Sequence, residues 1–349
     1  MSALAELSLD GLRRRLAGWG FRPSHAARLL RAFYAGGGEV AWDRLILPAG
    51  LRERMEAEGP LLRSRTEARQ AAPDGTVKLL LRLGDGRTVE SVLMPDHRAD
   101  RAAGCVSTQV GCAMGCDFCA TTRSGFERNL AAAEIVEQFL ALRREAQAAG
   151  RRLQTVVLMG MGEPMLNLDA VLEALPRLAE NRLGALGWRQ ITVSTVGIVP
   201  GIDRLAESGL GVQLAISLHG PDDATRARLI PAGRRYGVGE VLAAADRYQA
   251  RTGRPVIVQY CLLQGVNDAP EQARQLAGLL EARRMHVNLL RYNPTGLSLQ
   301  GRTYAAAPEE SAAAFAAVLK RHGVVAHFRR PRGREIDAAC GQLRERLAG

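Results

Sequence analysis

The chain has 349 residues, of which 47% are hydrophobic, enough for one large catalytic domain and a small accessory domain. Its formal net charge of +11 attracts polyanions such as nucleic acid. Lysine occurs only at Lys78 and Lys320, and genome composition explains this arginine excess as readily as RNA recognition does. No run of about 20 apolar residues occurs, and the first residues lack the basic-then-apolar order of a signal peptide. We therefore expect a cytoplasmic protein that does not enter a membrane.

The first 97 residues are predicted to form a small accessory domain. Residues 1–60 have a helical pattern, including a helix over 25–35 that a run of three glycines ends. Two β-like runs, 77–83 and 88–94, flank Gly84-Asp85-Gly86, which is a hairpin signal. We therefore predict helices followed by a β-hairpin, and we interpret this domain as an RNA-binding one.

From residue 105 onward, short apolar runs alternate with helical stretches. Strands are predicted at 105–110, 155–159, 191–195, 212–217, 256–262 and 286–291, with a further β-like run at 324–329. Helices are predicted at 131–149, 168–180, 200–208, 239–251, 270–283 and 308–322. This alternation is typical of an α/β fold with a parallel sheet, and six units fit a partial (β/α)6 barrel better than a closed TIM barrel. The predicted core spans 98–335 and is followed by a tail at 336–349.

The motif with the clearest chemistry is a C-x3-C-x2-C spacing formed by Cys112, Cys116 and Cys119 after a predicted strand. Clustered cysteines in a long cytosolic chain more often bind metal than form structural disulfides. Three thiolates on a 4Fe-4S cluster leave one iron open, and an open iron can chelate the amino and carboxylate groups of S-adenosylmethionine. The alternative is a zinc site, which needs a fourth nearby ligand, and the loop contains no histidine. We therefore predict a 4Fe-4S cluster.

This spacing resembles that of the radical S-adenosylmethionine (radical SAM) superfamily, and other segments extend the resemblance. Residues 159–164, Met-Gly-Met-Gly-Glu-Pro, resemble the superfamily segment that binds the methionine amino group, which implies that Gly162 and Glu163 bind S-adenosylmethionine. Five further residues lie at or just after the predicted strand ends, and each of them alone could be a simple turn residue. Together we interpret them as a cofactor rim: Ser194, Ser217, Leu218, His219 and Asn293.

A narrower resemblance covers most of the chain. Residues 105–112, the cluster motif, residues 159–164, the Ser-Leu-His segment and the tail residues 337–343, Asp-Ala-Ala-Cys-Gly-Gln-Leu, occur in this order in the RlmN/Cfr family. That family consists of radical SAM RNA methyltransferases that act on an adenine ring carbon and use two molecules of S-adenosylmethionine per turnover.

The resemblance implies a role for three further residues. Cys340 would accept a methyl group, and the deoxyadenosyl radical would take hydrogen from it, so that the resulting methylene radical adds to the ring. Glu90 would accept the ring proton. Cys105 would attack the Cys340 sulfur and release the RNA, leaving a transient disulfide. Cys261 is interpreted as a core residue of the fifth strand that does not replace Cys105.

The target atom stays open between two alternatives. RlmN-type enzymes methylate C-2 of an adenine in ribosomal RNA and some transfer RNAs, and Cfr-type enzymes methylate C-8. Pro164 and Gly125-Phe126 resemble RlmN, whereas residues 194–200 and 287–295 resemble Cfr more closely. We further expect a monomer and a reductant such as flavodoxin or ferredoxin. Two alternatives remain: a radical SAM enzyme acting on a non-RNA substrate, and a non-catalytic, zinc-bearing RNA-binding module.

Overall fold

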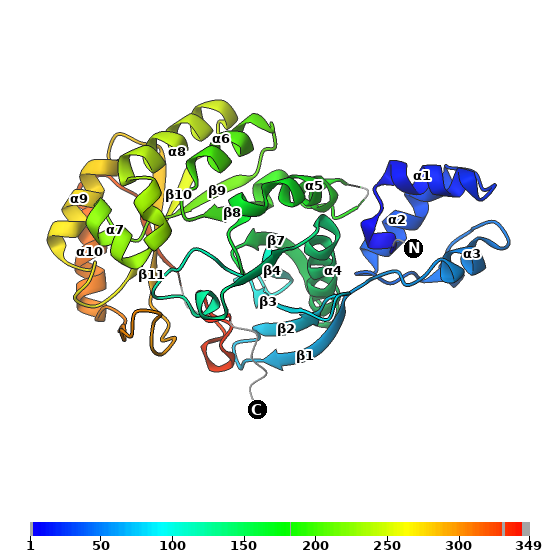
Figure 1. Ribbon diagram of the computed structural model, residues 1–349, viewed down its shortest axis with the longest axis horizontal. Helices are drawn as coiled ribbons and strands as arrows, with labels where there is room; N and C mark the ends of the chain where they lie inside the picture. The colour runs from blue at the N-terminus through cyan, green and yellow to red at the C-terminus, as the bar shows by residue number, and fades with distance from the viewer. Residues whose placement is uncertain (1–2, 182, 330–331, 344–349) are drawn as a thin grey trace.

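The computed structural model describes residues 3–181, 183–329 and 332–343. Ten strands form one sheet in the order β1-β2-β3-β4-β7-β8-β9-β10-β11-β12, which curves into an open barrel (Figure 1). Their bounds are β1 (Arg65–Ala71), β2 (Val77–Arg82), β3 (Thr88–Pro95), β4 (Arg101–Cys105), β7 (Arg152–Leu158), β8 (Ile191–Thr195), β9 (Gln213–Ser217), β10 (Val256–Leu262), β11 (Met285–Arg291) and β12 (Ala326–Arg329). A separate two-stranded ribbon consists of β5 (Gln109–Gly111) and β6 (Phe126–Asn129).

Within the ten-stranded sheet, β4, β7, β8, β9, β10, β11 and β12 pair in parallel, and helices connect them. This confirms the predicted partial barrel, to which β12 adds a further parallel strand. The helices are α1 (Leu9–Gly18), α2 (His25–Ala35), α3 (Leu51–Ala57), α4 (Ala132–Ala148), α5 (Leu168–Ala179), α6 (Val199–Glu207), α7 (Asp223–Leu229), α8 (Val238–Thr252), α9 (Pro270–Leu280) and α10 (Glu309–Arg321).

Three elements differ from the sequence prediction. The first barrel strand is β4, which ends at Cys105 instead of beginning there, because the chain then turns over the end of β7, where the Thr108 N–H donates to the Met161 carbonyl (2.8 Å). Helix α7 was missed because it is short and polar, and the Asp222 side chain caps its start. Strand β1 was missed because it lies at the sheet edge, mostly exposed and without an apolar alternation.

Strand alternation separates a helix-covered face from the inside of the barrel. On β10, Val258, Tyr260 and Leu262 belong to the main hydrophobic core, so Gln259 and Cys261 point the other way. Gln259 pairs in register with Ser217 on β9 and Asn288 on β11. Polar side chains therefore line the inside of the barrel, where a ligand with polar groups can be accommodated.

The predicted hairpin, β2 and β3, continues the core sheet because Val92 of β3 pairs with Cys105 of β4. Helices α1–α3 lie at one end of the molecule, beyond α4 (Figure 1). They are attached through buried polar contacts: Glu137 accepts from the Arg63 and Ser64 N–H groups (2.8 and 2.7 Å). No helix within the described ranges is long and apolar enough to cross a membrane.

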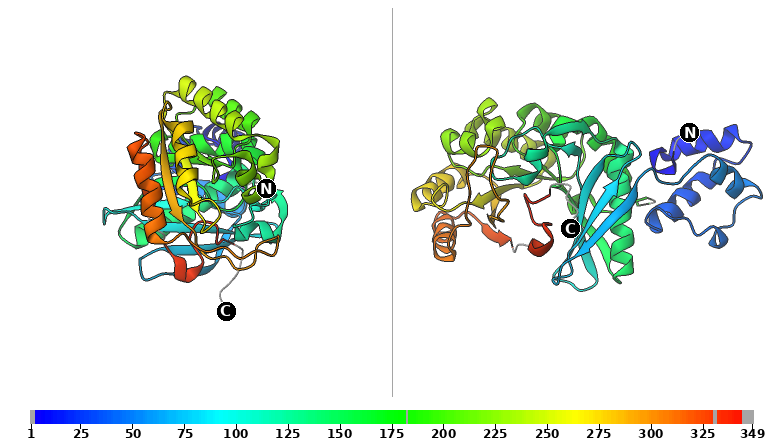
Figure 2. Two further views of the ribbon diagram at one scale, coloured as in Figure 1. Left: turned by 90° about the vertical axis from the view of Figure 1, so that its left-hand side faces the viewer. Right: turned by 60° about the horizontal axis from the view of Figure 1, so that its bottom comes forward.

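The segment after β12 returns to the opposite end of the sheet. The Gly333 N–H donates to Asp74 in the β1–β2 turn (3.1 Å), and the Thr121 hydroxyl donates to the Leu343 carbonyl (2.7 Å). Figure 2 shows this red segment beside the first strands of the sheet. The tail therefore spans the open side of the barrel, and residues 344–349 of the predicted tail lie outside the described residues.

Candidate active site

The cysteine loop starts from the β5–β6 ribbon, which fixes its first ligand. The Cys112 N–H donates to the Gly125 carbonyl at 2.8 Å. Gly111, just before it, has a φ of +71°, and a Cβ there would lie 1.9 Å from the same carbonyl oxygen. Only glycine therefore fits at 111 while the loop keeps this geometry.

Asp117, inside the cysteine motif, fastens the loop to distant parts of the chain. Its N–H donates to the Leu229 carbonyl (2.9 Å), and its carboxylate accepts from the Tyr304 hydroxyl (2.6 Å) and the Gln300 N–H (3.2 Å). The carboxylate is buried. Sequence reasoning missed this role, although the position of an acidic residue between two candidate ligands was a usable signal.

The three thiols lie together in a small apolar group that includes Met114 and Tyr292. Burial raises the pKa of Cys112 to about 12, and burial followed by the charge of Cys119 raises the pKa of Cys116. Such thiols ionise when a metal supplies the compensating positive charge. The donor set therefore fits a 4Fe-4S cluster.

Among the described residues, no group of three His, Cys, Asp or Glu side chains meets the geometry for holding a metal ion. The cysteines of a cubane bind separate irons, so the three thiols need not converge on one ion to hold a cluster.

Glu163 follows a tight turn whose glycines allow close packing. Gly162 has a φ of +100°, and a Cβ there would lie 2.5 Å from the Gln109 Cβ. The Glu163 carboxylate accepts from the Met165 and Val196 N–H groups (3.0 and 2.8 Å), and burial raises its pKa to about 7. A cationic amino group beside it would hold it ionised, so this segment fits the methionine end of S-adenosylmethionine.

The predicted cofactor rim is only partly composed of inward-facing side chains. Ser194 and Ser217 lie near the ends of β8 and β9 and face the inside of the barrel, whereas the Leu218 side chain packs in the main core. The Asn293 Nδ2 donates weakly to the Cys340 carbonyl (3.4 Å), and its buried Oδ1 has no hydrogen-bond partner among the described residues. This orphaned acceptor fits a ligand that donates a hydrogen bond.

His219 and Arg226 form a buried polar pair that closes the ends of β8 and β9. The His219 Nδ1 accepts from the Cys261 N–H (2.9 Å), and burial followed by the Arg226 charge lowers the His219 pKa to about 3, so the ring is neutral. Arg226 donates to the Ser217 and Leu218 carbonyls (2.9 and 2.8 Å) and its charge favours the ionised forms of Cys116 and Glu163. No motif in the sequence around Arg226 indicated that this arginine is buried beside the cysteine loop.

The tail holds Cys340 beside the cysteine loop, since the Ala120 N–H donates to the Gly341 carbonyl (2.7 Å). Cys340 is solvent-exposed, yet protein around its sulfur and the charge of Cys119 raise its pKa. The residue is thus exposed on the tail while its sulfur faces the cysteine loop. Burial raises the pKa of Cys105 to about 12, and the Cys340 charge adds to this rise.

Cys261 also lies near this group, unlike the plain core residue predicted from the sequence. It belongs to the apolar group that contains Cys112 and Cys116, and its thiol interacts electrostatically with Cys340. The alternation of side chains along the predicted strand was a usable signal, because it places Cys261 on the face opposite the apolar core residues of β10. All six cysteines are free thiols, so the disulfide between Cys105 and Cys340 stays a prediction.

Glu90 is fully buried on β3, and its Oε1 lies 3.0 Å from the Lys78 Nζ of β2. The Ser107 hydroxyl donates to the Glu90 carbonyl (2.7 Å), which fixes the backbone at this position. Glu90 is therefore a buried side chain that is ion-paired with Lys78, and not a solvated strand residue.

Comparison with known proteins places these features in context. The profile of the "Radical SAM superfamily" matches residues 106–277. A "Probable dual-specificity RNA methyltransferase RlmN 1" of Opitutus terrae is 65% identical, with 98% of this chain and 96% of that protein covered. A protein of Thermus thermophilus named as a probable RlmN is 45% identical, with 96% and 92% covered. The crystal structure of a radical SAM methyltransferase from Sphaerobacter thermophilus superposes with a TM-score of 0.91 at 42% identity, covering 99% of both chains.

The cysteine motif generates a first prediction. Changing Cys112, Cys116 or Cys119 to alanine should abolish cluster binding, because a cubane held by three thiolates has no spare protein ligand. Iron and sulfide analysis after anaerobic reconstitution measures this. Cys261→Ala is the matched control, since it removes a thiol from the same apolar group and should keep the full iron content. A full four-iron count in any motif variant would contradict the assignment.

The loop glycines generate a second prediction. Gly111 and Gly125 both have a left-handed φ (+71° and +73°), but a Cβ on Gly125 meets nothing within 4 Å. Gly125→Ala should therefore lose only about 1–3 kcal/mol of stability, through a backbone conformation (φ +73°, ψ −166°) that residues with a side chain rarely adopt. Gly111→Ala should also displace the loop and bind less iron. Thermal unfolding and iron content measure the two effects, and equal iron content in both variants would refute the close-contact argument.

Proposed function

This chain belongs to the RlmN/Cfr family of radical SAM RNA methyltransferases, and from that membership we propose that it methylates C-2 of an adenine in ribosomal RNA and transfer RNA. It is an enzyme whose cofactors are a 4Fe-4S cluster and S-adenosylmethionine. The names of the 65% and 45% identical relatives support C-2 over C-8, and the words "dual-specificity" support two classes of RNA. A radical SAM enzyme with a non-RNA substrate is the alternative that the tests below address.

The observation that carries the proposal is the position of Cys340 against the cysteine loop. The Ala120–Gly341 and Thr121–Leu343 hydrogen bonds attach the residues that directly follow Cys340 to the end of the cysteine loop. A thiol needed only for packing would have no reason to be solvent-exposed between the loop and β4. This arrangement supports Cys340 as the thiol that carries the methyl group.

In the proposed cycle, the bound cofactors supply the methyl group, the reducing electron and the hydrogen-abstracting radical. Cys340 accepts the methyl group on Sγ and loses its proton. After hydrogen is removed from that methyl, its carbon bonds to the adenine ring, so that the RNA is joined to Cys340. Glu90 accepts the ring proton, and the electron left over from the radical addition would pass back to the cluster. Cys105, as a thiolate, then attacks the Cys340 sulfur, which forms a disulfide and breaks the carbon–sulfur bond. The released carbon keeps the bonding pair and takes up a proton, so that it becomes the methyl group on the ring.

The cofactor roles of Gly162, Glu163, Ser194, Ser217, Leu218, His219 and Asn293 are part of the proposal. Glu163 and the orphaned Asn293 Oδ1 have the clearest support, as a carboxylate for an amino group and as an acceptor for a donor. Leu218 would contribute through its main chain alone, because its side chain packs in the core.

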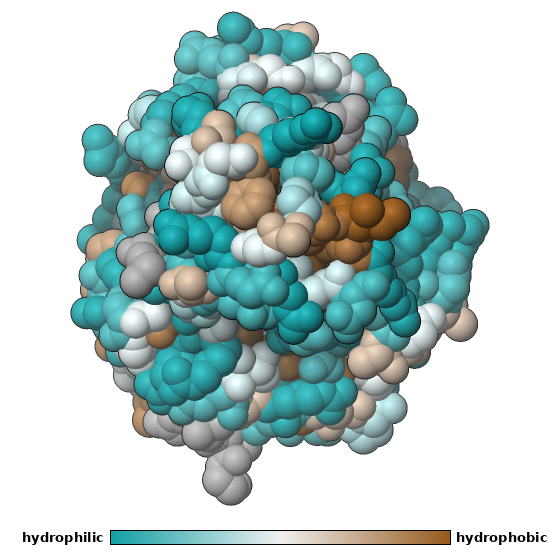
Figure 3. Space-filling view, turned by 90° about the vertical axis from the view of Figure 1, so that its right-hand side faces the viewer, coloured by the Kyte–Doolittle hydropathy of each residue, from teal (hydrophilic) through white to brown (hydrophobic). Residues whose placement is uncertain are grey.

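We keep three segments as proposed functional units: 1–97 for RNA binding, 98–335 as the radical SAM core and 336–349 for the methyl-carrying cysteine. The strands β1–β3 of the first segment join the core sheet and carry Glu90, so its RNA-binding part is the helical region α1–α3. The face of the molecule at the end formed by α1–α3 is mainly hydrophilic, with one apolar patch (Figure 3). The helical segment before β1 carries several exposed arginines, including Arg14, Arg22, Arg28, Arg31 and Arg44. Such side chains suit phosphate contacts on folded RNA. We also propose a monomer in the cytoplasm that takes electrons from a flavodoxin or ferredoxin.

The substrate class generates a third prediction. RNA from a strain that lacks this gene, incubated with the reconstituted enzyme, should gain methyl on adenine C-2, identified by nucleoside mass spectrometry. Binding should weaken steeply with salt, by about 10³-fold or more between 50 and 200 mM if about six phosphates are contacted. Methylation at C-8 would reassign the target atom. Activity on a protein or metabolite, with none on RNA, would overturn the proposed function.

The two non-cluster cysteines generate a fourth prediction. Cys340→Ala should neither accept methyl nor become joined to RNA, with normal iron content. Cys105→Ala should carry the methyl, form the adduct and accumulate it, because release needs a second thiolate. Since Cys261 also lies near Cys340, the Cys105→Ala/Cys261→Ala variant provides the complete test. Denaturing gels with nuclease treatment and mass measurement detect the adduct. Normal turnover of the double variant would exclude a thiol-resolved release.

A further inference from the structure

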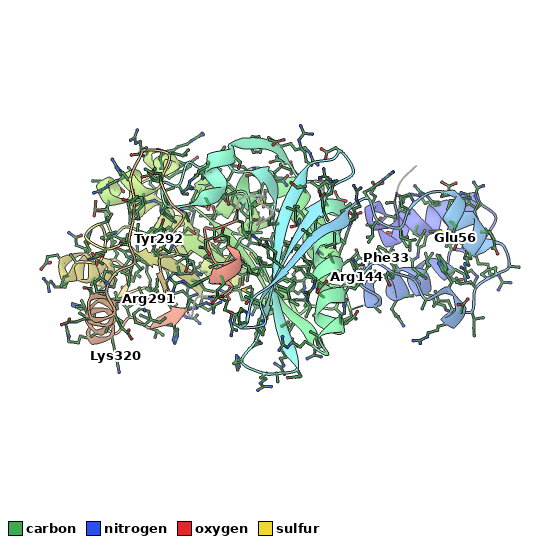
Figure 4. All side chains as sticks on the ribbon, turned by 90° about the horizontal axis from the view of Figure 1, so that it is seen from below. Phe33, Glu56, Arg144, Arg291, Tyr292 and Lys320 are labelled. Carbon is green, nitrogen blue, oxygen red and sulfur yellow. The ribbon has the colours of Figure 1, made fainter. Side chains whose placement is uncertain are left out.

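Lys78 is exceptional in the composition of this chain. Only two of the 47 basic residues are lysines, and the other, Lys320, is exposed on α10, far from the hairpin (Figure 4). Lys78 is buried. An arginine would bring a planar fork with five donors to satisfy, whereas an ammonium is a compact charge with three donors. A lysine kept in the interior of an arginine-rich chain therefore marks a position that requires a compact cation.

The partner of this cation is the candidate proton acceptor. The Lys78 Nζ lies 3.0 Å from the Glu90 Oε1, and the side chains are 5% and 0% exposed. Glu90 pairs with Leu80 and Lys78 pairs with Val92, so the two residues are diagonal neighbours on one face of the antiparallel β2–β3 hairpin. A long side chain spans this diagonal distance.

Two other charged side chains on the elements around Glu90 have partners of their own among the described residues. Arg82, further along β2, pairs with Glu67 of β1. Glu137 of α4 accepts from the backbone of residues 63 and 64. Cys105 of β4 pairs with Val92, two residues from Glu90, and burial raises its pKa so that it is a neutral thiol at pH 7.

We propose that Lys78 is a positioning residue that keeps the Glu90 carboxylate ionised and fixed in place for accepting the ring proton. The inference rests on the proposed role of Glu90. A buried carboxylate without compensating charge takes up a proton instead of remaining ionised. A protonated Glu90 has no capacity to accept the ring proton, so the ion pair sets whether this step can occur.

The test reads the protonation state of Glu90 directly by infrared difference spectroscopy on four purified proteins: wild type, Lys78→Met, Lys78→Met/Glu90→Gln and Lys320→Met. At pH 7, Lys78→Met should gain a band of a protonated, buried carboxyl group that wild type lacks and that the double variant loses. Glu163, another buried carboxyl group, absorbs in the same infrared region, but it is present in all four proteins and its band cancels in the difference spectra. Lys320→Met changes the other lysine and should match wild type.

The second readout is the pH dependence of RNA methylation in single turnover. Loss of the cation should move the acidic limb of the Lys78→Met profile to higher pH, past pH 7, so that the rate at pH 7 falls by about tenfold or more relative to wild type. Lys78→Arg keeps the charge and should restore the position of the limb, even if the larger group lowers the maximum rate. A purely structural role would lower the rate equally at every pH.

The outcomes separate the inference from the proposed function. A folded Lys78→Met protein with normal iron, no new carboxyl band and an unchanged limb would overturn the role of Lys78. If Lys78→Met fails to fold, the double variant should recover folding, because the uncompensated carboxylate is gone, and failure of both would also overturn it. Wild type that leaves RNA unmethylated contradicts the proposed function instead, and an undiminished rate of a Glu90→Gln single variant contradicts the base assignment and with it this inference.

Discussion

The hydrogen bond from the Ala120 N–H to the Gly341 carbonyl joins two segments that are more than two hundred residues apart in the sequence. Ala120 directly follows Cys119, and Gly341 directly follows Cys340, so this one bond sets the position of the tail thiol relative to the cysteine loop. The loop is itself fixed by Asp117 and by the Cys112–Gly125 hydrogen bond. The positions of Cys112 and Cys340 thus depend mainly on hydrogen bonds between main-chain groups. Reactive groups held in this way lose little conformational freedom during the reaction.

Charge inside the barrel is balanced between a few buried groups. Arg226 supplies a positive charge near Cys116 and Glu163, and Lys78 supplies one at Glu90. Burial alone would keep the thiols and Glu163 protonated, as the raised pKa values of Cys112 and Glu163 indicate. Ionised cysteines therefore require the cofactor charge, which couples the binding of the cluster to the release of protons.

Much of the fold follows from local patterns in the sequence. Alternating apolar runs and amphipathic stretches predicted the parallel barrel, and the C-x3-C-x2-C spacing predicted the cysteine loop, because both signals lie within short segments. The contacts of Asp117 with Gln300 and Tyr304 join residues far apart in the chain, so no local pattern contains them. The Lys78–Glu90 pair depends on the hairpin register, and the location of Cys340 depends on the return path of the tail. Cys261 could have been found, since the alternation of β10 already assigned it to the inner face.

Within the part of the chain that the structure describes, the ten-stranded sheet does not close into a ring, and β1 and β12 form its two edges. An open edge offers unpaired N–H and C=O groups to any passing strand, which is a route to aggregation. Here β1 alternates charged side chains, Arg65, Glu67 and Arg69, along one edge, and β12 at the other edge has only four residues. Both devices discourage strand addition by another copy of the chain. The barrel can therefore stay open toward a large substrate while edge-to-edge association between copies of the chain is disfavoured.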